Sequence, residues 1–268
     1  MPNNFASDVN CKALWRFENG ALTADSKGGN TLTAAGTPTA DQVNFKEGAA
    51  SVQVQDGAAP DSFSITDALL DAGFPFKLAD AIKKISATFW IKCTAMPADT
   101  KTGSVFLKSS AIAHYSIAIA VETDGLGDTY IEFWLGNGLA WTIYQHASAL
   151  AINTWYHVGV TYQDSDQAYR IRIWDDTAGA ILGVDKTGNG LNAWIGDGDL
   201  SITSAGAMTS LTALVDEIVV FNDILTVAEI DAIRAGTYGG GKPPIFGGLN
   251  RKRCPLNAAQ KSGMLAEL

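Results

Sequence analysis

Apolar and polar residues alternate with a period of two along most of this chain. The alternation is clearest over residues 85–93, 116–121, 130–135, 155–162 and 169–174. These segments are short and rich in β-branched and aromatic residues, and clusters of Gly, Asn and Asp separate them, which is typical of strands joined by tight turns. No alternation of strand and helix occurs. The pattern predicts roughly ten to fourteen strands in an all-β, two-sheet antiparallel sandwich of the jelly-roll type.

A helical pattern is confined to two places. Residues 67–81 are expected to contain a turn or two, which Pro75 interrupts. In the second place, Thr226 precedes Glu229 by three residues, which is the spacing of a capping box, and Gly236 follows the last periodic residue. The sequence therefore predicts one short helix near the C-terminal end of the sandwich.

The chain divides near Tyr238, after which a stretch rich in Gly and Pro begins. We therefore expect one jelly-roll domain over residues 1–238 and an extended tail over residues 239–268. The net charge of −9 divides in the same way, because the residues from Gly241 onward carry +4 and the rest carry −13. An acidic body disfavours nucleic-acid binding. The longest apolar run has only about seven residues, which predicts no membrane insertion.

The basic tail predicts an attachment arm. Arg251, Lys252 and Arg253 would meet an acidic protein surface, and Phe246 would fill an apolar groove. This interpretation implies a protein partner for the tail and an oligomeric assembly. The alternative is that the tail folds back on its own body, whose charge is opposite.

An ordered series of segments resembles the laminin-G-like family of concanavalin A-like lectin and glucanase domains. The segments that carry the resemblance are residues 13–18 (ALWRFE), 25–30 (DSKGGN), 85–92 (ISATFWIK), 153–162 (NTWYHVGVTY) and 214–233 (LVDEIVVFNDILTVAEIDAI). The resemblance covers roughly residues 11–238, and it departs from the family at residues 173–176 (IWDD), where the family has a YvNG-like turn. It implies two stacked sheets and recognition of glycans or proteins, but no single activity.

Many domains of that family bind one structural calcium ion through loop oxygens. The resemblance implies that Asp25, Asn30 and Asp216 would meet if the first and last strands are neighbours. The alternative is that these residues are turn and cap residues, since Asp and Asn stabilise turns without metal.

A carbohydrate site would need aromatic faces with polar groups beside them. A hairpin over residues 130–145 with its turn at Asn137 and Gly138 would place Trp134 opposite Trp141 on one face. The predicted ligand-binding residues on this face are Tyr130, Glu132, Trp134, Trp141 and Gln145. The other face is apolar and predicts core, so the tryptophan side would be a half-exposed concave or rim surface. The alternative is that the aromatic pair only stabilises the sheet.

We expect no catalytic residues. The closest match to the acidic strand of related glycosidases, Glu229–Arg234, falls in the predicted helix and ends in Arg. Asp216 and Glu217 are adjacent, so they would point to opposite faces of a strand, and only one would enter a cleft. The histidines have no metal or triad spacing, and His157 is expected to be packed within a strand.

These observations predict a non-catalytic recognition or adhesion module that a larger assembly carries, such as a phage virion decoration or tail protein anchored by its C-terminal tail. The N-terminus lacks the basic start and apolar stretch of a secretory signal, and Cys11, Cys93 and Cys254 predict no disulfide framework. Export by a non-classical route is the alternative location. A free carbohydrate-binding lectin and a polysaccharide-cleaving glycosidase are the alternative functions.

Overall fold

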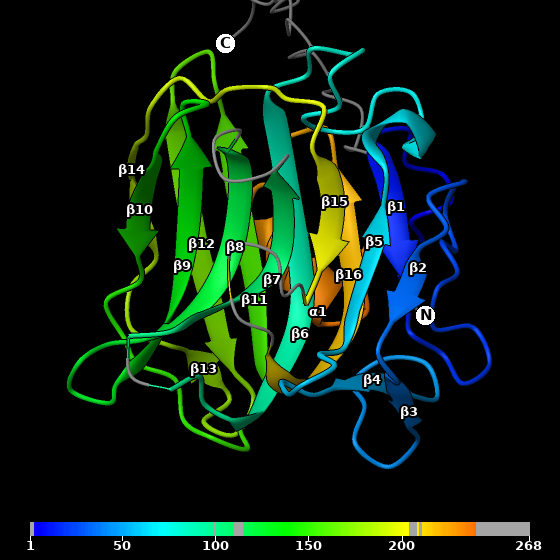
Figure 1. Ribbon diagram of the computed structural model, residues 1–268, viewed down its shortest axis with the longest axis vertical. Coiled ribbons are helices and arrows are strands. Elements are labelled where there is room, and N and C mark those ends of the chain that lie inside the picture. Colours follow the sequence, from blue (N-terminus) through cyan, green and yellow to red (C-terminus); the bar gives the residue numbers. More distant parts are fainter. Residues whose placement is uncertain (1–2, 99, 110–114, 204–207, 209–210, 240–268) are drawn as a thin grey trace, which may run out of the picture.

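The fold is a two-layer β-sandwich with one short helix (Figure 1), in a computed structural model that describes residues 3–98, 100–109, 115–203, 208 and 211–239. All strand pairs within the two sheets are antiparallel, which confirms the predicted sandwich. The predicted tail contacts of Phe246, Arg251, Lys252 and Arg253 lie outside the described residues.

One sheet has nine strands, and its centre is formed by β6 and β16. Along the order β13-β12-β11-β6-β16-β4-β3, β14 also pairs with β12 and β1 also pairs with β16. The bounds are β1 (Cys11–Trp15), β3 (Thr39–Asp41), β4 (Ser51–Val54), β6 (Lys84–Ala95), β11 (Tyr156–Gln163), β12 (Ala168–Asp175), β13 (Ala180–Ile181), β14 (Lys186–Asn189) and β16 (Thr212–Phe221).

The other sheet has seven strands in the order β10-β9-β8-β7-β15-β5-β2. Their bounds are β2 (Thr33–Ala35), β5 (Ser62–Ile65), β7 (Thr102–Ser109), β8 (Tyr115–Thr123), β9 (Thr129–Gly136), β10 (Trp141–Gln145) and β15 (Asp199–Ile202). The total exceeds the ten to fourteen expected. Strands such as β2, β3 and β13 are only two or three residues long, which is too short to leave a periodic pattern.

The core lies between the two sheets, because alternate residues of each strand point inward. Phe89, Val158 and Ile171 come from the nine-stranded sheet, and Ile119 and Phe133 face them from the seven-stranded sheet. Each such side chain stabilises the fold by about 1.5–3 kcal/mol relative to leaving it exposed.

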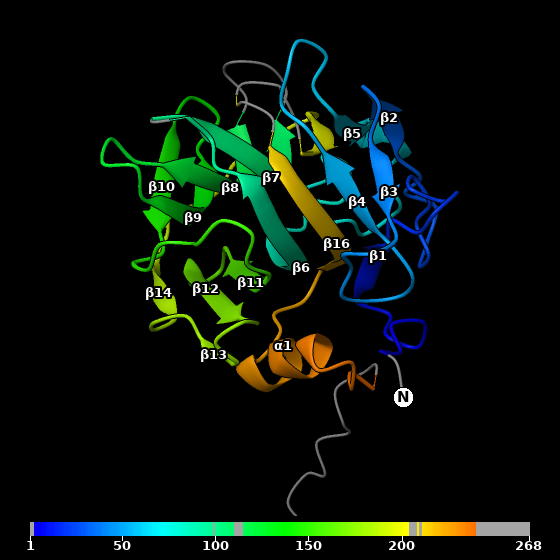
Figure 2. The same cartoon turned by 90° about the horizontal axis from the view of Figure 1, so that it is seen from below.

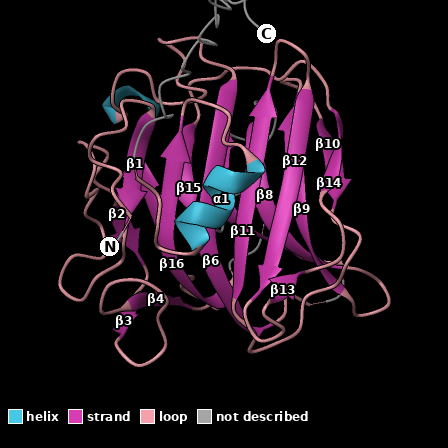
Figure 3. Ribbon diagram, turned by 180° about the vertical axis from the view of Figure 1, so that it is seen from behind, coloured by secondary structure: helices cyan, strands magenta, loops and turns pink. Residues whose placement is uncertain are grey.

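Helix α1 (Val227–Arg234) covers the outer face of the nine-stranded sheet (Figure 3). The predicted capping box is confirmed, because the Thr226 hydroxyl accepts a bond from the Glu229 amide (3.2 Å) and the Glu229 carboxylate accepts one from the Thr226 amide (2.7 Å). Ile230 packs directly over Gly159, where a Cβ atom would lie 2.7 Å from its Cγ2. The other predicted helical segment contains only the 3-10 turn η1 (Asp67–Leu69).

The two ends of the predicted body lie side by side, as Figure 2 shows from below. The Asn4 amide donates to the Tyr238 carbonyl (2.8 Å), and the Tyr238 amide donates to Asn3 Oδ1 (2.9 Å). The ring of Phe5 stacks on that of Tyr238 with centroids 5.5 Å apart. These contacts hold the N-terminal segment against the end of α1.

No helix in the part of the chain that the structure describes is long and apolar enough to span a membrane.

Candidate functional site

The predicted aromatic residues lie on the outer face of the seven-stranded sheet, on the edge strand β10 and its neighbour β9. On β9, Ile131, Phe133 and Leu135 point into the core, so the alternate residues point outward. We call the outward surface the tryptophan face. It consists of Tyr130, Glu132, Trp134, Trp141, Ile143 and Gln145. The structure thus brings all five predicted residues onto one surface.

The register of this hairpin differs from the predicted one. Trp134 pairs with Ile143 and not with Trp141, because the turn is a four-residue loop over 137–140 and not a two-residue turn. Asn137 Oδ1 stabilises the loop by accepting bonds from the amides of Leu139 and Ala140 (both 2.9 Å). The shift is two residues, so every side chain keeps its face.

Trp134 and Trp141 are diagonal neighbours across the two strands. Their ring centroids are 5.7 Å apart and their planes meet at 75°, which is the edge-to-face geometry that aromatic pairs favour. Both indoles are half-buried, Ile143 is 45% exposed and Gln145 is exposed. The pair therefore presents aromatic surface to solvent as well as packing against itself.

Glu132 lies beneath this surface and is only 2% exposed. Its Oε2 accepts a hydrogen bond from Trp134 Nε1 (2.7 Å), and its carboxyl group is hydrogen-bonded to that of Glu122 on β8. Burial, together with the Glu122 carboxyl, raises the pKa of Glu132 to about 8, and the Trp134 indole acts in the opposite direction.

The sequence analysis missed Glu122 and Ile143. Glu122 continues the alternation of residues 116–121 by one position, and the turn over 124–128 folds it back beside Tyr130, its partner in the register. The alternation of residues 116–122 was visible in the sequence. Placing Glu122 beside Glu132, however, required the register of β8 on β9.

A small apolar cluster extends the tryptophan face across β8 and β7. Leu107, Ala118, Ala120 and Met208 are buried there, and Trp134 and Trp141 pack against them. Met208, from the segment after β15, covers the small alanine side chains. The face is therefore covered on the β7 side and open on the β10 side.

Two of the three predicted calcium ligands are bonded to each other. Asp25 Oδ1 accepts from the amides of Leu14 (2.9 Å) and Lys27 (2.8 Å), and Oδ2 accepts from the amide (3.1 Å) and side chain (2.9 Å) of Asn30. Asn30 Oδ1 accepts from the Asp71 amide (2.8 Å). Each side-chain oxygen of Asp25 and Asn30 thus accepts a hydrogen bond from the turn itself or from the chain beside it, as expected of turn and cap residues.

Asp216 lies in a different set of contacts. Its Oδ2 accepts from the amides of Lys46 (2.7 Å) and Glu47 (3.0 Å), and neither of these donors belongs to the turn that holds Asp25 and Asn30. Within the described ranges, no group of three or more His, Cys, Asp or Glu side chains could hold a metal ion. Asp25 and Asn30 thus share one set of hydrogen bonds, and Asp216 belongs to another.

Asp216 and Glu217 are both buried, 0% and 3% exposed. The expectation that they point to opposite faces rests on regular alternation, which a bulge between Asp216 and Val219 breaks, with Glu217 at φ 44°. Among the residues that the structure describes, neither Asp216 Oδ1 nor Glu217 Oε1 has a hydrogen-bond partner. Burial raises the pKa of Asp216 to about 7 and that of Glu217 to about 8, and the charge of Glu47 adds to the latter shift.

The prediction that His157 is packed within a strand is confirmed. His157 is buried and packs edge-on against Trp90 with centroids 5.0 Å apart. Burial lowers its pKa to about 3, and the charges of Arg234 and Arg172 add to the effect. His114 lies outside the described residues.

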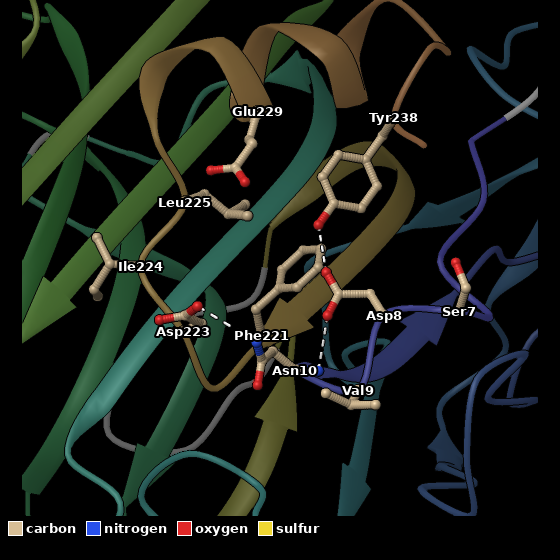
Figure 4. Close-up of a pocket in the computed structure, with 10 residues that line it drawn as sticks. All are labelled: Ser7, Asp8, Val9, Asn10, Phe221, Asp223, Ile224, Leu225, Glu229 and Tyr238. Carbon is tan, nitrogen blue, oxygen red and sulfur yellow. Dashed lines mark hydrogen bonds between the residues drawn. The ribbon is translucent and has the colours of Figure 1, made fainter. Parts of the chain in front are cut away.

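Two hollows lie on the other side of the molecule, near α1. One, of about 180 Å³, is lined by the carboxylates of Asp8, Asp223 and Glu229 (Figure 4). Its polar groups are bonded to one another, because Asp8 accepts from the Tyr238 hydroxyl and from the Asn10 amide. The other is a groove of about 650 Å³ between the start of α1 and strands β12 and β14. Neither contains a predicted site residue.

Comparison with known proteins places this geometry in a family. The family model described as the concanavalin A-like lectin/glucanases superfamily matches residues 61–231. No curated protein matches the chain in sequence.

Solved structures with the same fold include glycan complexes. Domain 4 of AbnA, an extracellular arabinanase from Geobacillus stearothermophilus solved with arabinotriose, superposes with a TM-score of 0.56 at 16% identity, over 85% of this chain and 99% of that one. The binding domain of botulinum neurotoxin DC in complex with SialylT gives 0.60 at 12% identity, over 86% and 52%. The chain thus spans about half the length of the neurotoxin binding domain. At these identities the likeness shows the fold.

Proposed function

Since the chain belongs to the concanavalin A-like lectin/glucanase superfamily, we propose that it is a non-catalytic recognition module that binds carbohydrate on its tryptophan face. The observation that carries this proposal is the half-buried pair of Trp134 and Trp141 on an open sheet surface. The arabinanase domain was solved with arabinotriose, and the neurotoxin domain with SialylT. Those complexes support a carbohydrate as the class of ligand.

The chemistry of the face suits a sugar chain. A pyranose or furanose ring presents C–H groups that pack against an indole, and each tryptophan offers a large, rigid apolar surface with a polar edge. Gln145 is exposed beside the pair, and its amide can both donate to and accept from hydroxyl groups. An open strand surface also leaves room for a polymer, which an enclosed pocket would not.

The contact between Glu122 and Glu132 supports binding without cleavage. A retaining glycosidase holds its two carboxyl groups about 5–5.5 Å apart and an inverting enzyme about 6.5–9.5 Å apart. These two carboxyl groups are hydrogen-bonded to each other, which leaves no room for a glycosidic bond between them. Release of reducing ends from a polysaccharide panel would favour the glycosidase alternative.

A glycan array with three variants tests the proposal. The wild-type protein is expected to bind a subset of oligosaccharides, and Trp134→Ala and Trp141→Ala are each expected to weaken that binding at least about tenfold, or about 1.4 kcal/mol. Trp174→Ala is the matched control, because Trp174 is a half-buried tryptophan on the nine-stranded sheet, beneath Arg234. Undiminished binding by both face variants, or no binding by the wild type, would refute the proposal.

We further propose that residues 239–268 attach this module to a larger assembly, such as a virion. The support is the charge division of −13 and +4 and the Gly- and Pro-rich composition of the segment. A free lectin, with no partner for the tail, is the alternative.

A further inference from the structure

Glu132 and Glu122 form an acidic contact that the proposed sugar stacking does not by itself explain. Glu132 is almost completely buried although it belongs to the outward side of β9, and Glu122 is half-buried. No salt bridge joins either residue to a Lys or Arg in the described part of the chain. Two like charges in contact, without a cation, are unfavourable unless one is neutral.

The register of β8 and β9 brings the two side chains together. Glu132 pairs with Ala120, and Glu122 pairs with Tyr130, so the two glutamates are diagonal neighbours on one face. Diagonal positions on adjacent strands lie within reach of long side chains. Two carboxylates so placed, without a cation, repel each other, so the pair is most stable when its two members hold one proton between them.

The other side of Glu132 is bonded to the aromatic pair. Trp134 Nε1, which can only donate, is 2.7 Å from Glu132 Oε2, and this bond fixes the direction in which the indole lies. Trp141 then packs edge-on against that indole. The contacts form one continuous chain from Glu122 through Glu132 and Trp134 to Trp141.

We propose that Glu132 is a positioning residue of the tryptophan face, and that the proton it shares with Glu122 makes carbohydrate binding dependent on pH. The inference rests on the proposed function and adds its regulation. With the proton in place, Glu132 stays close to Glu122 and holds the Trp134 indole. Without it, the two carboxylates repel each other, Glu132 moves toward solvent, and Trp134 loses its orientation.

The groups around Glu132 offer no compensating positive charge. The groups that face it from the described neighbouring elements are Glu122, Ala118 and Ala120 on β8, Tyr130 and Trp134 on β9, Ile143 and Gln145 on β10, Leu107 on β7 and Met208. Asp124 and Asp128, whose charges act on the neighbouring Tyr130, are also acidic. Because the pKa of Glu132 is raised to about 8, the proton is held at neutral pH and is lost as the pH rises through about 8.

A fluorescence titration without ligand tests the shared proton. The signal of Trp134 is obtained as the difference between wild type and Trp134→Phe, from pH 5.5 to 10. A transition near pH 8 is expected, and Glu132→Gln should abolish it, because the amide can still accept from Trp134 and donate to Glu122 but does not ionise. Asp216→Asn is the control, since Asp216 lies opposite Trp90 in the register of β16 and β6, and burial raises the pKa of Asp216 to about 7. It should leave the difference signal unchanged.

Binding of the oligosaccharide with the strongest array signal tests the regulation. Wild type is expected to bind at least about tenfold more weakly at pH 9.5 than at pH 6.5, whereas Glu132→Gln should bind equally at both within about twofold. Glu132→Leu, which removes the acceptor, should bind weakly at both. A flat difference signal, or the same pH dependence in Glu132→Gln, would overturn the inference even where the glycan binds. A transition near pH 8 in a protein that binds no glycan would overturn the proposed function and the regulation together, while supporting the positioning of Trp134.

Discussion

At the scale of single residues, the most informative groups are three buried carboxyl groups. Glu132, Asp216 and Glu217 are nearly inaccessible, and none of them takes part in a salt bridge within the described residues. Burial favours the neutral form of an acid. At a given pH between the unfolded and folded pKa values, the folded chain therefore keeps protons that the unfolded chain has released.

This gives the protein a stability that depends on pH. The pKa values of Asp216 and Glu217 rise from 3.8 and 4.5 to about 7 and about 8. Because the folded-state values are the higher ones, the stabilisation is complete below about pH 4 and is lost as the pH rises through 7 to 8. The free energy of unfolding should therefore fall between pH 5 and 8, by up to about 1.4 kcal/mol per pH unit for each group, and flatten above.

Urea unfolding from pH 5 to 9 measures this slope. The double variant Asp216→Asn, Glu217→Gln should reduce it to the part that Glu132 contributes. Asp176→Asn, which alters a partly exposed ion pair with Lys46, should leave it unchanged. A stability that is constant over this range in the wild type would contradict the account of these carboxyl groups.

At the scale of elements, the packing of α1 on the nine-stranded sheet depends on one glycine. Gly159 lies in the middle of β11, where Ile230 occupies the space above it. A strand interior rarely favours Gly, which lacks a side chain to pack, so its place here is explained by the close approach of the helix.

Gly159→Ala should lower the free energy of unfolding by about 1–3 kcal/mol, because its Cβ would lie 2.7 Å from Ile230 Cγ2. The loss should be smaller when the same change is made in an Ile230→Ala background, where the space is free, and a double-mutant cycle in urea measures that difference. Gly125→Ala is the matched control, since no atom lies within 4 Å of the added Cβ. Equal effects at the two glycines would show that the helix does not press on the sheet.

The same scale shows what the sequence could and could not predict. Period-two alternation predicted the long strands and the faces of β9, and the capping box at Thr226 predicted α1. The predicted partner of Trp134 was wrong because two extra loop residues leave the alternation intact. The pattern of apolar and polar residues is therefore identical for both registers. The faces of Asp216 and Glu217 could not be taken from the alternation, because the bulge between Asp216 and Val219 has no signature in the residues before it. The pattern also could not show whether Asp216 joins the turn of Asp25 and Asn30, because a contact between segments so far apart in the chain depends on tertiary structure.

At the scale of the whole molecule, the two sheets present different outer surfaces. The nine-stranded sheet is covered by α1 and by the N-terminal segment (Figures 2 and 3), whereas Ile143 and Gln145 on the outer face of the seven-stranded sheet are exposed. One outer surface is thus used for folding, and the other is the surface that we propose binds carbohydrate. The +4 tail begins beside α1, at Tyr238, and so at the covered surface.

Removal of residues 240–268 should leave the fold intact, because both sheets, the core and α1 lie within residues 3–239. The melting temperature should change by no more than about 2 °C. In sedimentation, the full chain should form an assembly and the truncated chain a monomer. The same sedimentation behaviour for both chains would contradict the attachment role of the tail.

The most direct test of the central claim is a crystal structure with the best-bound oligosaccharide. The account predicts a sugar ring stacked on Trp134 or Trp141, with Gln145 within hydrogen-bond distance of a hydroxyl group. A sugar seated instead in the small pocket beside Tyr238, or in the groove beside α1, with the tryptophan face empty, would contradict it.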